Sequence, residues 1–183
     1  MGSIKLFTVT SIIDIIAKDP HPKNFSLPSY TYPYEARRIV VEEALSVGSS
    51  HILFLDSDMV VKGDVIQRLA NHNKAVVGAM YNERRLPLTS TVKIKKDGEF
   101  VDFNTNDLPK SLFQCYAVGT GCMLVETAIF EKLEKPWFFF SSHPDGSMDY
   151  GEDVWFCDRV QKAGFSVWCD PTIEIRHIGE YGY

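Results

Sequence analysis

The stretch HILFLDSDMVV, residues 51–61, joins a continuous apolar run to two carboxylates. Ile52 to Leu55 has the pattern of a strand that is buried in the centre of a sheet. Asp56 and Asp58 follow this strand directly, so we expect both acids at its carboxyl end. In open α/β sheets, ligands bind at that edge. The stretch therefore predicts a central strand with a binding site where the strand ends.

Strand and helix patterns alternate along the rest of the chain, which favours an α/β fold. The other expected strands are Lys5 to Thr10, Ala75 to Ala79, Cys122 to Val125, Ser166 to Cys169 and Ile173 to Arg176. The expected helices run from Pro33 to Val47, Asp64 to Ala70, Thr127 to Leu133 and Asp153 to Ala163. Thr91 to Lys95 and Phe100 to Phe103 flank a Lys-Asp-Gly turn and predict a hairpin. We expect one domain over residues 1–183, with a mixed, mostly parallel central sheet flanked by helices.

The composition is that of an ordinary globular domain. Of the 183 residues, 45% are hydrophobic and 23% are charged, and the net charge of -5 argues against a surface for nucleic acid. The longest apolar stretches, such as Trp137 to Phe140, are too short to span a membrane, and no signal peptide opens the chain. A cytoplasmic protein is the expectation. The four cysteines show no zinc-site spacing, and we expect them to be small buried hydrophobes. A disulfide between two of them stays open. They are Cys115, Cys122, Cys157 and Cys169.

The D-x-D pair has the chemistry of a metal site. Asp56 and Asp58 lie at i and i+2 on an extended chain, so they can reach one hard cation together. Mg²⁺ or Mn²⁺ held in this way keeps open positions that diphosphate oxygens can fill, and it neutralises charge on a departing nucleotide diphosphate. A turn in which both acids accept hydrogen bonds from backbone amides explains the same pattern.

Further titratable side chains allow a structural and a functional interpretation. Glu152 and Asp153 open an expected helix, where they stabilise the helix dipole, and where an ionised carboxylate can also act as a general base. His177 ends an apolar alternation and is either a hydrogen-bonded structural residue or the third member of an Asp/Asp/His metal set. Arg38 has Glu42 at i+4 and can form a surface ion pair. Arg37 has no such partner at i+4 and can reach a phosphate.

Two short segments are equally ambiguous. Four consecutive aromatic residues, Trp137 to Phe140, cannot all enter one core face. We expect most of them in the core and one or two in a position to stack against a sugar. Gly119-Thr120-Gly121 either lets the backbone approach a ligand closely or forms a tight turn between strands.

Taken together, four segments resemble the GT-A glycosyltransferases, most closely the small family 2-like enzymes of bacterial, archaeal and viral genomes. They are HILFLDSDMVV at 51–61, AVGTGCMLVETAIFEKL at 117–133, GEDVWFCDRVQKAGFSVWCD at 151–170 and IEIRHIG at 173–179. The resemblance covers roughly residues 34–179, and the order and spacing of four motifs make it more specific than D-x-D alone. It implies a Rossmann-like nucleotide-binding domain with a shortened donor-binding part at about 1–60 and an acceptor and catalytic part at about 90–183. Such proteins transfer a sugar from a nucleotide-diphosphate sugar to an acceptor hydroxyl, here on an unspecified glycan, protein or small molecule.

The resemblance also implies a metal set. Asp58 would bind the divalent cation, Mn²⁺ or Mg²⁺. Asp56 would contact the metal or the donor ribose. His177 would be a further ligand of the metal or of the diphosphate.

The remaining roles concern the base and the donor nucleotide. Asp153, the second acid of the family's E-D motif after Glu152, would be the catalytic base of an inverting enzyme. Arg37 matches an arginine that family members place near the donor nucleotide. Thr8 and Thr10, near the end of the first expected strand, would be contacts to the nucleotide base or ribose.

Two other functions fit parts of the sequence. A haloacid dehalogenase-like phosphatase also has D-x-D after an apolar strand, with Asp56 as nucleophile and Asp58 as acid/base, but its motif normally opens the fold near the N-terminus. A non-catalytic module that binds nucleotide sugars is the second alternative. The sequence leaves the oligomeric state open, a homo-oligomer included, and for a viral protein the expected location is the host cytoplasm.

Overall fold

The computed structural model describes residues 4–21, 23–28, 32–84, 87–96, 99–103, 109–142, 144–145 and 148–179. The helices are α1 (Leu6–Lys18), α2 (Pro33–Ser46), α3 (Val65–Ala70), the 3₁₀ helix η2 (Thr127–Glu131) and α4 (Glu152–Lys162). The strands are β1 (His51–Leu55), β2 (Met59–Val60), β3 (Val76–Ala79), β4 (Lys93–Lys96), β5 (Glu99–Asp102), β6 (Phe113–Cys115), β7 (Cys122–Glu126), β8 (Ser141–Ser142), β9 (Met148–Tyr150), β10 (Val167–Asp170) and β11 (Arg176–His177).

The central sheet is mixed and mostly antiparallel. Its five strands lie in the order β1-β7-β3-β10-β6. The β3–β10 pair is parallel, whereas the pairs β1–β7, β7–β3 and β10–β6 are antiparallel. The expectation of a mostly parallel sheet is therefore wrong, because the reversed strand β7 lies between β1 and β3 and the reversed strand β6 adds to the far edge. The strands β1, β3 and β10 still run in one direction, so their carboxyl ends point to the same side of the molecule.

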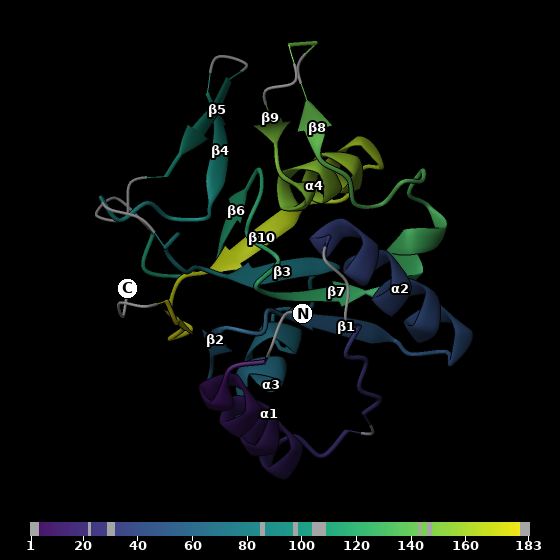
Figure 1. The fold of residues 1–183 in the computed structure, drawn as a ribbon, viewed down its shortest axis with the longest axis vertical. Coiled ribbons are helices and arrows are strands. Elements are labelled where there is room, and N and C mark those ends of the chain that lie inside the picture. The colour runs from purple at the N-terminus through teal and green to yellow at the C-terminus, as the bar shows by residue number, and fades with distance from the viewer. Residues whose placement is uncertain are drawn as a thin grey trace.

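Helices cover both faces of this sheet, which confirms the expected α/β architecture. Figure 1 shows α2 and α4 on one face and α1 and α3 on the other. Ile52 and Phe54 of β1 belong to the core on the α2 and α4 side, whereas Leu53 and Leu55 pack against the core on the α1 and α3 side. Burial on both faces explains the continuous apolar run of β1. The strand nevertheless lies at the sheet edge, not in the centre as expected, since its sheet partner is β7.

The N-terminal segment is the helix α1, so the expected strand over Lys5 to Thr10 is wrong. Thr8 and Ser11 are buried on one helical face at i and i+3. The Thr8 hydroxyl donates to the Ser57 carbonyl at 3.0 Å, and the Ser11 hydroxyl accepts the Val61 amide at 3.0 Å. Polar side chains thus tie α1 to the D-x-D turn. Several of its apolar side chains face solvent instead, so the apolar pattern did not mark the buried face.

Most other expected elements are present. The helix α2 ends before Gly48, whose φ of 69° is the left-handed conformation that glycine adopts readily. The strands β4 and β5 form the expected hairpin, and its turn residues 97–98 lie outside the described residues. The strand expected over Ile173 to Arg176 is displaced, since β11 shares only Arg176 with it, and the helix expected over Thr127 to Leu133 is the shorter η2. The four cysteines are buried and free. Among the described residues, no helix has the length and apolar character needed to cross a membrane.

Candidate functional site

A short pairing between β2 and β11 brings the far end of the chain to the D-x-D turn. His177 lies opposite Met59 in this ladder, and the Ile178 amide donates to the Asp58 carbonyl at 2.8 Å. The His177 side chain is consequently next to the Asp58 carboxylate, with Nε2 3.5 Å from Oδ1. Backbone pairing therefore sets the position of both side chains, which the sequence motifs had suggested separately.

Asp58 has a second cationic partner. Arg84, from the loop after β3, places Nη1 2.8 Å from Asp58 Oδ2. Burial alone would raise the pKa of Asp58, but the hydrogen bond with His177 and the charges of His177 and Arg84 outweigh burial and hold that pKa below its usual value. The Asp58 carboxylate is therefore ionised over a wide pH range and can serve as a ligand for a cation.

The two ring nitrogens of His177 both face oxygen atoms. Nδ1 lies 3.0 Å from the Asn82 carbonyl, which can only accept a hydrogen bond, so Nδ1 carries a proton. A neutral ring then points the Nε2 lone pair at Asp58, and a cation can bind between the two side chains. Burial lowers the pKa of His177, but the hydrogen bonds with Asp58 and Asn82 raise it more.

Asp58 and His177 are the two side chains of the expected metal set that lie together, and they could hold a Mg²⁺ or Mn²⁺ ion only with further ligands from water or a bound phosphate. Within the described part of the chain, no three or more His, Cys, Asp or Glu side chains form a metal-binding group. Asp58 and His177 supply two ligands. Magnesium sites commonly use one or two carboxylates and take the rest from water and substrate phosphates.

Asp56 is oriented toward other partners. Its Oδ1 accepts a hydrogen bond from Arg37 Nη2 at 3.0 Å, and Arg37 Nη1 pairs with Glu152 at the start of α4. Burial alone would lower the pKa of the Arg37 guanidinium, but the charges of Asp56 and Glu152 raise it. Arg37 thus links the end of β1 to α4, whereas Arg38 forms the expected surface pairs, including the one with Glu42.

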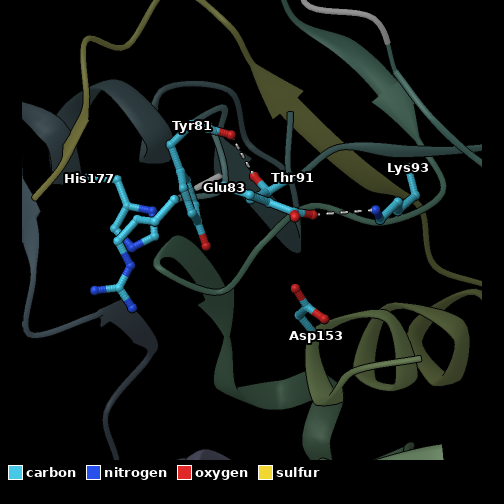
Figure 2. A pocket seen from close by; sticks show the side chains of 7 residues that line it. Tyr81, Glu83, Thr91, Lys93, Asp153 and His177 are labelled. Atoms are coloured by element: carbon cyan, nitrogen blue, oxygen red, sulfur yellow. Dashed lines mark hydrogen bonds and ion pairs between the residues drawn. The ribbon is translucent and has the colours of Figure 1, made fainter. Parts of the chain in front are cut away.

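An open pocket of about 470 Å³ lies beside Asp58 and its partners His177 and Arg84. Its lining residues are Tyr81, Glu83, Arg84, Thr91, Lys93, Asp153 and His177. Figure 2 shows Asp153 rising from the first turn of α4 toward the segment that carries Tyr81 and Glu83. Both partners of Asp58 line this pocket, so it connects His177 and Arg84 with the carboxylate of Asp153.

Asp153 has the electrostatic environment of a base. Its Oδ1 accepts a hydrogen bond from the Val154 amide at 2.8 Å, which fixes the side chain. Burial raises the pKa of Asp153, and the Val154 amide and the charge of Arg37 oppose this only in part. Burial likewise raises the pKa of the neighbouring Glu152, with the Arg37 charge opposing. A carboxyl with a raised pKa accepts a proton more readily than an ordinary aspartate.

Sequence reasoning missed most of the pocket. Tyr81, Glu83 and Arg84 follow β3, and Thr91 and Lys93 follow the same loop. Lys93 Nζ lies 3.7 Å from Glu83 Oε1, and the Thr91 hydroxyl donates to the Tyr81 carbonyl at 3.0 Å. A signal did exist, because residues at the carboxyl end of any strand parallel to β1 are candidates by the rule that selected Asp56 and Asp58.

The two N-terminal threonines have structural partners. Thr8 is buried and bonds to the Ser57 carbonyl, as described above. Thr10 is exposed, and its hydroxyl donates to the Phe7 carbonyl within α1 at 2.7 Å. Neither side chain lines the pocket. Their placement on a helix therefore gives no support to the expected donor contacts.

The aromatic run divides between core and surface. Trp137 and Phe138 are buried, whereas Phe139 is 45% exposed. The ring of Phe139 lies 5.4 Å from that of Trp155 in α4, and the ring of Phe140 lies 5.7 Å from that of Tyr34 in α2. The second half of the run thus forms an aromatic surface between these two helices.

Gly119 and Gly121 make room for Tyr81. The Tyr81 hydroxyl accepts a hydrogen bond from the Gly121 amide at 2.9 Å, and a Cβ on Gly121 would lie 2.6 Å from that hydroxyl and 2.5 Å from Met59 Cε. We expect Gly121→Ala to lower the free energy of unfolding by about 1–3 kcal/mol, the usual cost of overpacking, measured by denaturant titration. The loss should be smaller in a Met59→Ala/Tyr81→Phe background, where the two nearest atoms, Met59 Cε and the Tyr81 hydroxyl oxygen, are both gone. An equal loss in both backgrounds would contradict this assignment.

Comparison with known proteins gives a likeness of fold. No family model matches the chain, and no curated protein matches it. Among solved structures, the crystal structure of A197 from STIV is similar, with a TM-score of 0.66 and 20% sequence identity, over 98% of this chain and 82% of that chain.

Proposed function

We propose that this chain is a glycosyltransferase of the GT-A type, which transfers a sugar from a nucleotide-diphosphate sugar to an acceptor hydroxyl. One observation carries the proposal. The same pocket is lined by His177 and Arg84, the partners of Asp58, and by Asp153. One end has the chemistry to bind a diphosphate, and the other has the chemistry to take a proton. Three of the sequence segments that resemble this family contain Asp58, Asp153 and His177, whereas Arg84 lies outside them.

The diphosphate end combines a metal with side-chain cations. Asp58 and His177 would hold Mn²⁺ or Mg²⁺, which when bound neutralises charge on the leaving diphosphate. Arg84 adds a guanidinium that can donate two parallel hydrogen bonds to phosphate oxygens. Arg37 keeps Asp56 at the end of β1, where the carboxylate can meet the donor ribose.

At the other end, Asp153 would act as the general base. It takes the proton of the acceptor hydroxyl while the acceptor oxygen bonds to the anomeric carbon of the sugar, and the bond from that carbon to the diphosphate oxygen breaks. The electron pair of the broken bond leaves with the diphosphate, and attack from the face opposite to the diphosphate inverts the configuration. Thr91, Lys93 and Glu83 supply hydrogen-bonding groups beside Asp153 for an acceptor.

A thermal-shift screen of nucleotide sugars and nucleoside diphosphates, with Mn²⁺ or with EDTA, tests the proposal. We expect one nucleotide to raise the Tm by about 5–10 °C at 100 times its Kd, because ligand binding to the folded state adds about 2.7 kcal/mol there. The shift should need Mn²⁺ and should be absent with the matching nucleoside monophosphate.

Two outcomes would favour other functions. Hydrolysis of a simple aryl phosphate that disappears in Asp56→Asn would indicate the phosphatase. Mn²⁺-dependent nucleotide binding without sugar release, to water or to any acceptor, would indicate a binding module.

A further inference from the structure

Each oxygen of the Asp58 carboxylate lies beside a nitrogen atom of another side chain. His177 Nε2 lies 3.5 Å from Oδ1, and Arg84 Nη1 lies 2.8 Å from Oδ2. The Asp58 side chain is only 15% exposed, so few other approaches to it are open. A cation that enters here therefore meets a carboxylate whose charge Arg84 already neutralises.

The Arg84 side chain is much more exposed than the Asp58 side chain. Its side chain is 48% exposed, comes from the loop after β3 and lines the pocket. A half-exposed arginine can exchange one anion for another at little cost, because exposed ion pairs are weak. Phosphate oxygens in the pocket would offer the guanidinium a bidentate partner of higher charge than one carboxylate.

We propose that Arg84 competes with the metal ion for Asp58 and releases this carboxylate when a diphosphate binds, so that metal and donor bind cooperatively. The inference rests on the proposed function for its diphosphate. Without a diphosphate, Arg84 stays on Asp58 Oδ2 and repels a divalent cation. With a diphosphate, the guanidinium turns to the phosphates, and Asp58 Oδ2 is released for the ion. The coupling is reciprocal, because each ligand then strengthens binding of the other by the same factor.

Neighbouring cations do not share this arrangement. Lys93 lines the same pocket, but its ammonium pairs with Glu83 and Asp102. Arg176 precedes His177 in β11 and is exposed. Adjacent residues of a strand point to opposite faces, so Arg176 does not face Asp58 as His177 does. Arg176 carries the same charge as Arg84. It provides a matched control.

The test compares the wild-type chain, Arg84→Gln and Arg176→Gln by calorimetric titration with Mn²⁺ alone. We expect Arg84→Gln to bind Mn²⁺ about fivefold more tightly than wild type, which is the effect of removing one competing ion pair. Arg176→Gln should match wild type. Asp58→Asn added to Arg84→Gln should abolish the gain. Mn²⁺ affinity in Arg84→Gln that is equal to or weaker than wild type would overturn the proposal.

A second titration repeats the comparison with the nucleoside diphosphate that gives the largest shift in the screen. In wild type it should raise Mn²⁺ affinity by a factor at least about fivefold larger than in Arg84→Gln. A gain with Mn²⁺ alone and no nucleotide binding by any variant would retain the competition at Asp58 and reject the glycosyltransferase. Nucleotide binding with equal Mn²⁺ coupling in both variants would do the reverse.

Discussion

Asp58→Ala is expected to lower the Mn²⁺-dependent affinity for the donor nucleotide by about 100-fold or more. Asp58 is the carboxylate that His177 and Arg84 share, and it is the anionic member of the proposed ligand set. Its removal leaves Arg84 and His177 without the carboxylate between them, so a divalent cation loses its main attraction to the site. Isothermal titration of the nucleotide with Mn²⁺ and with EDTA measures the effect.

Asp64→Ala is a matched control for this variant. Asp64 lies nearby in sequence, is exposed, and makes no side-chain capping bond to α3. The control should bind nucleotide and metal as wild type does. Unchanged Mn²⁺-dependent affinity in Asp58→Ala would show that the metal lies elsewhere.

Asp153→Asn should leave donor binding intact and lower the rate of sugar transfer by about 10² to 10⁴, the usual contribution of a general base. Asparagine keeps an oxygen for the Val154 amide, which now donates to Asp153 Oδ1 at 2.8 Å, so the side chain can hold its place. Only the ability to take a proton is lost. Transfer assays at saturating donor, together with nucleotide titration, separate the two effects. A parallel loss of donor binding would assign Asp153 to holding the donor.

The raised pKa of Asp153 adds two pH dependences of opposite sign. A base works when ionised, so the wild-type transfer rate should rise as pH rises through the raised pKa. Folding instead favours the protonated form of a group whose pKa is higher in the folded state. The stability that this group contributes is present below its unfolded pKa and is lost as pH rises through the folded pKa. Asp153→Asn, which stays neutral, should therefore unfold at a higher temperature than wild type at about pH 7 and at the same temperature at about pH 3.

Asp158 on the same helix serves as the control for these stability measurements. Burial would raise the pKa of Asp158, but hydrogen bonds with Lys162 and Tyr116 outweigh it and lower that pKa. Its ionised form therefore stabilises the fold, and this contribution is lost as pH falls through the folded pKa. Asp158→Asn should be less stable than wild type at about pH 7. Destabilisation by Asp153→Asn at that pH would contradict the burial argument.

Local periodicity predicted the elements that carry an apolar face. The helix spacing of α2 and α4 and the apolar runs of β1, β3 and β7 marked these segments within a residue or two. The same pattern did not reveal strand direction, because the apolar run of β7 has the same sequence pattern whether the strand pairs parallel or antiparallel. The helix α1 was missed since Thr8 and Ser11, its contacts with the D-x-D turn, are polar.

The residues of the candidate site that lie in sequence motifs were predictable, and those outside the motifs were not. The sequence singled out Asp58, His177 and Asp153, and the structure places all three at or beside one pocket. Arg84 and Tyr81 belong to no motif and lie in a loop of ordinary composition. Their relevance follows from the sheet order, which makes β1 and β3 end on one side, and that order depends on contacts between distant segments.

The β2–β11 ladder consists of the pairs Arg176–Val60 and His177–Met59. So short a ribbon at the periphery of a domain opens far more often than the buried strands of the main sheet, without global unfolding. Opening would carry His177 away from Asp58 and dismantle the proposed ion site while the rest of the molecule stays folded. An ion bound between these two side chains would hold the two strands of the ribbon together. Ligand occupancy would then control whether this end of the chain stays attached.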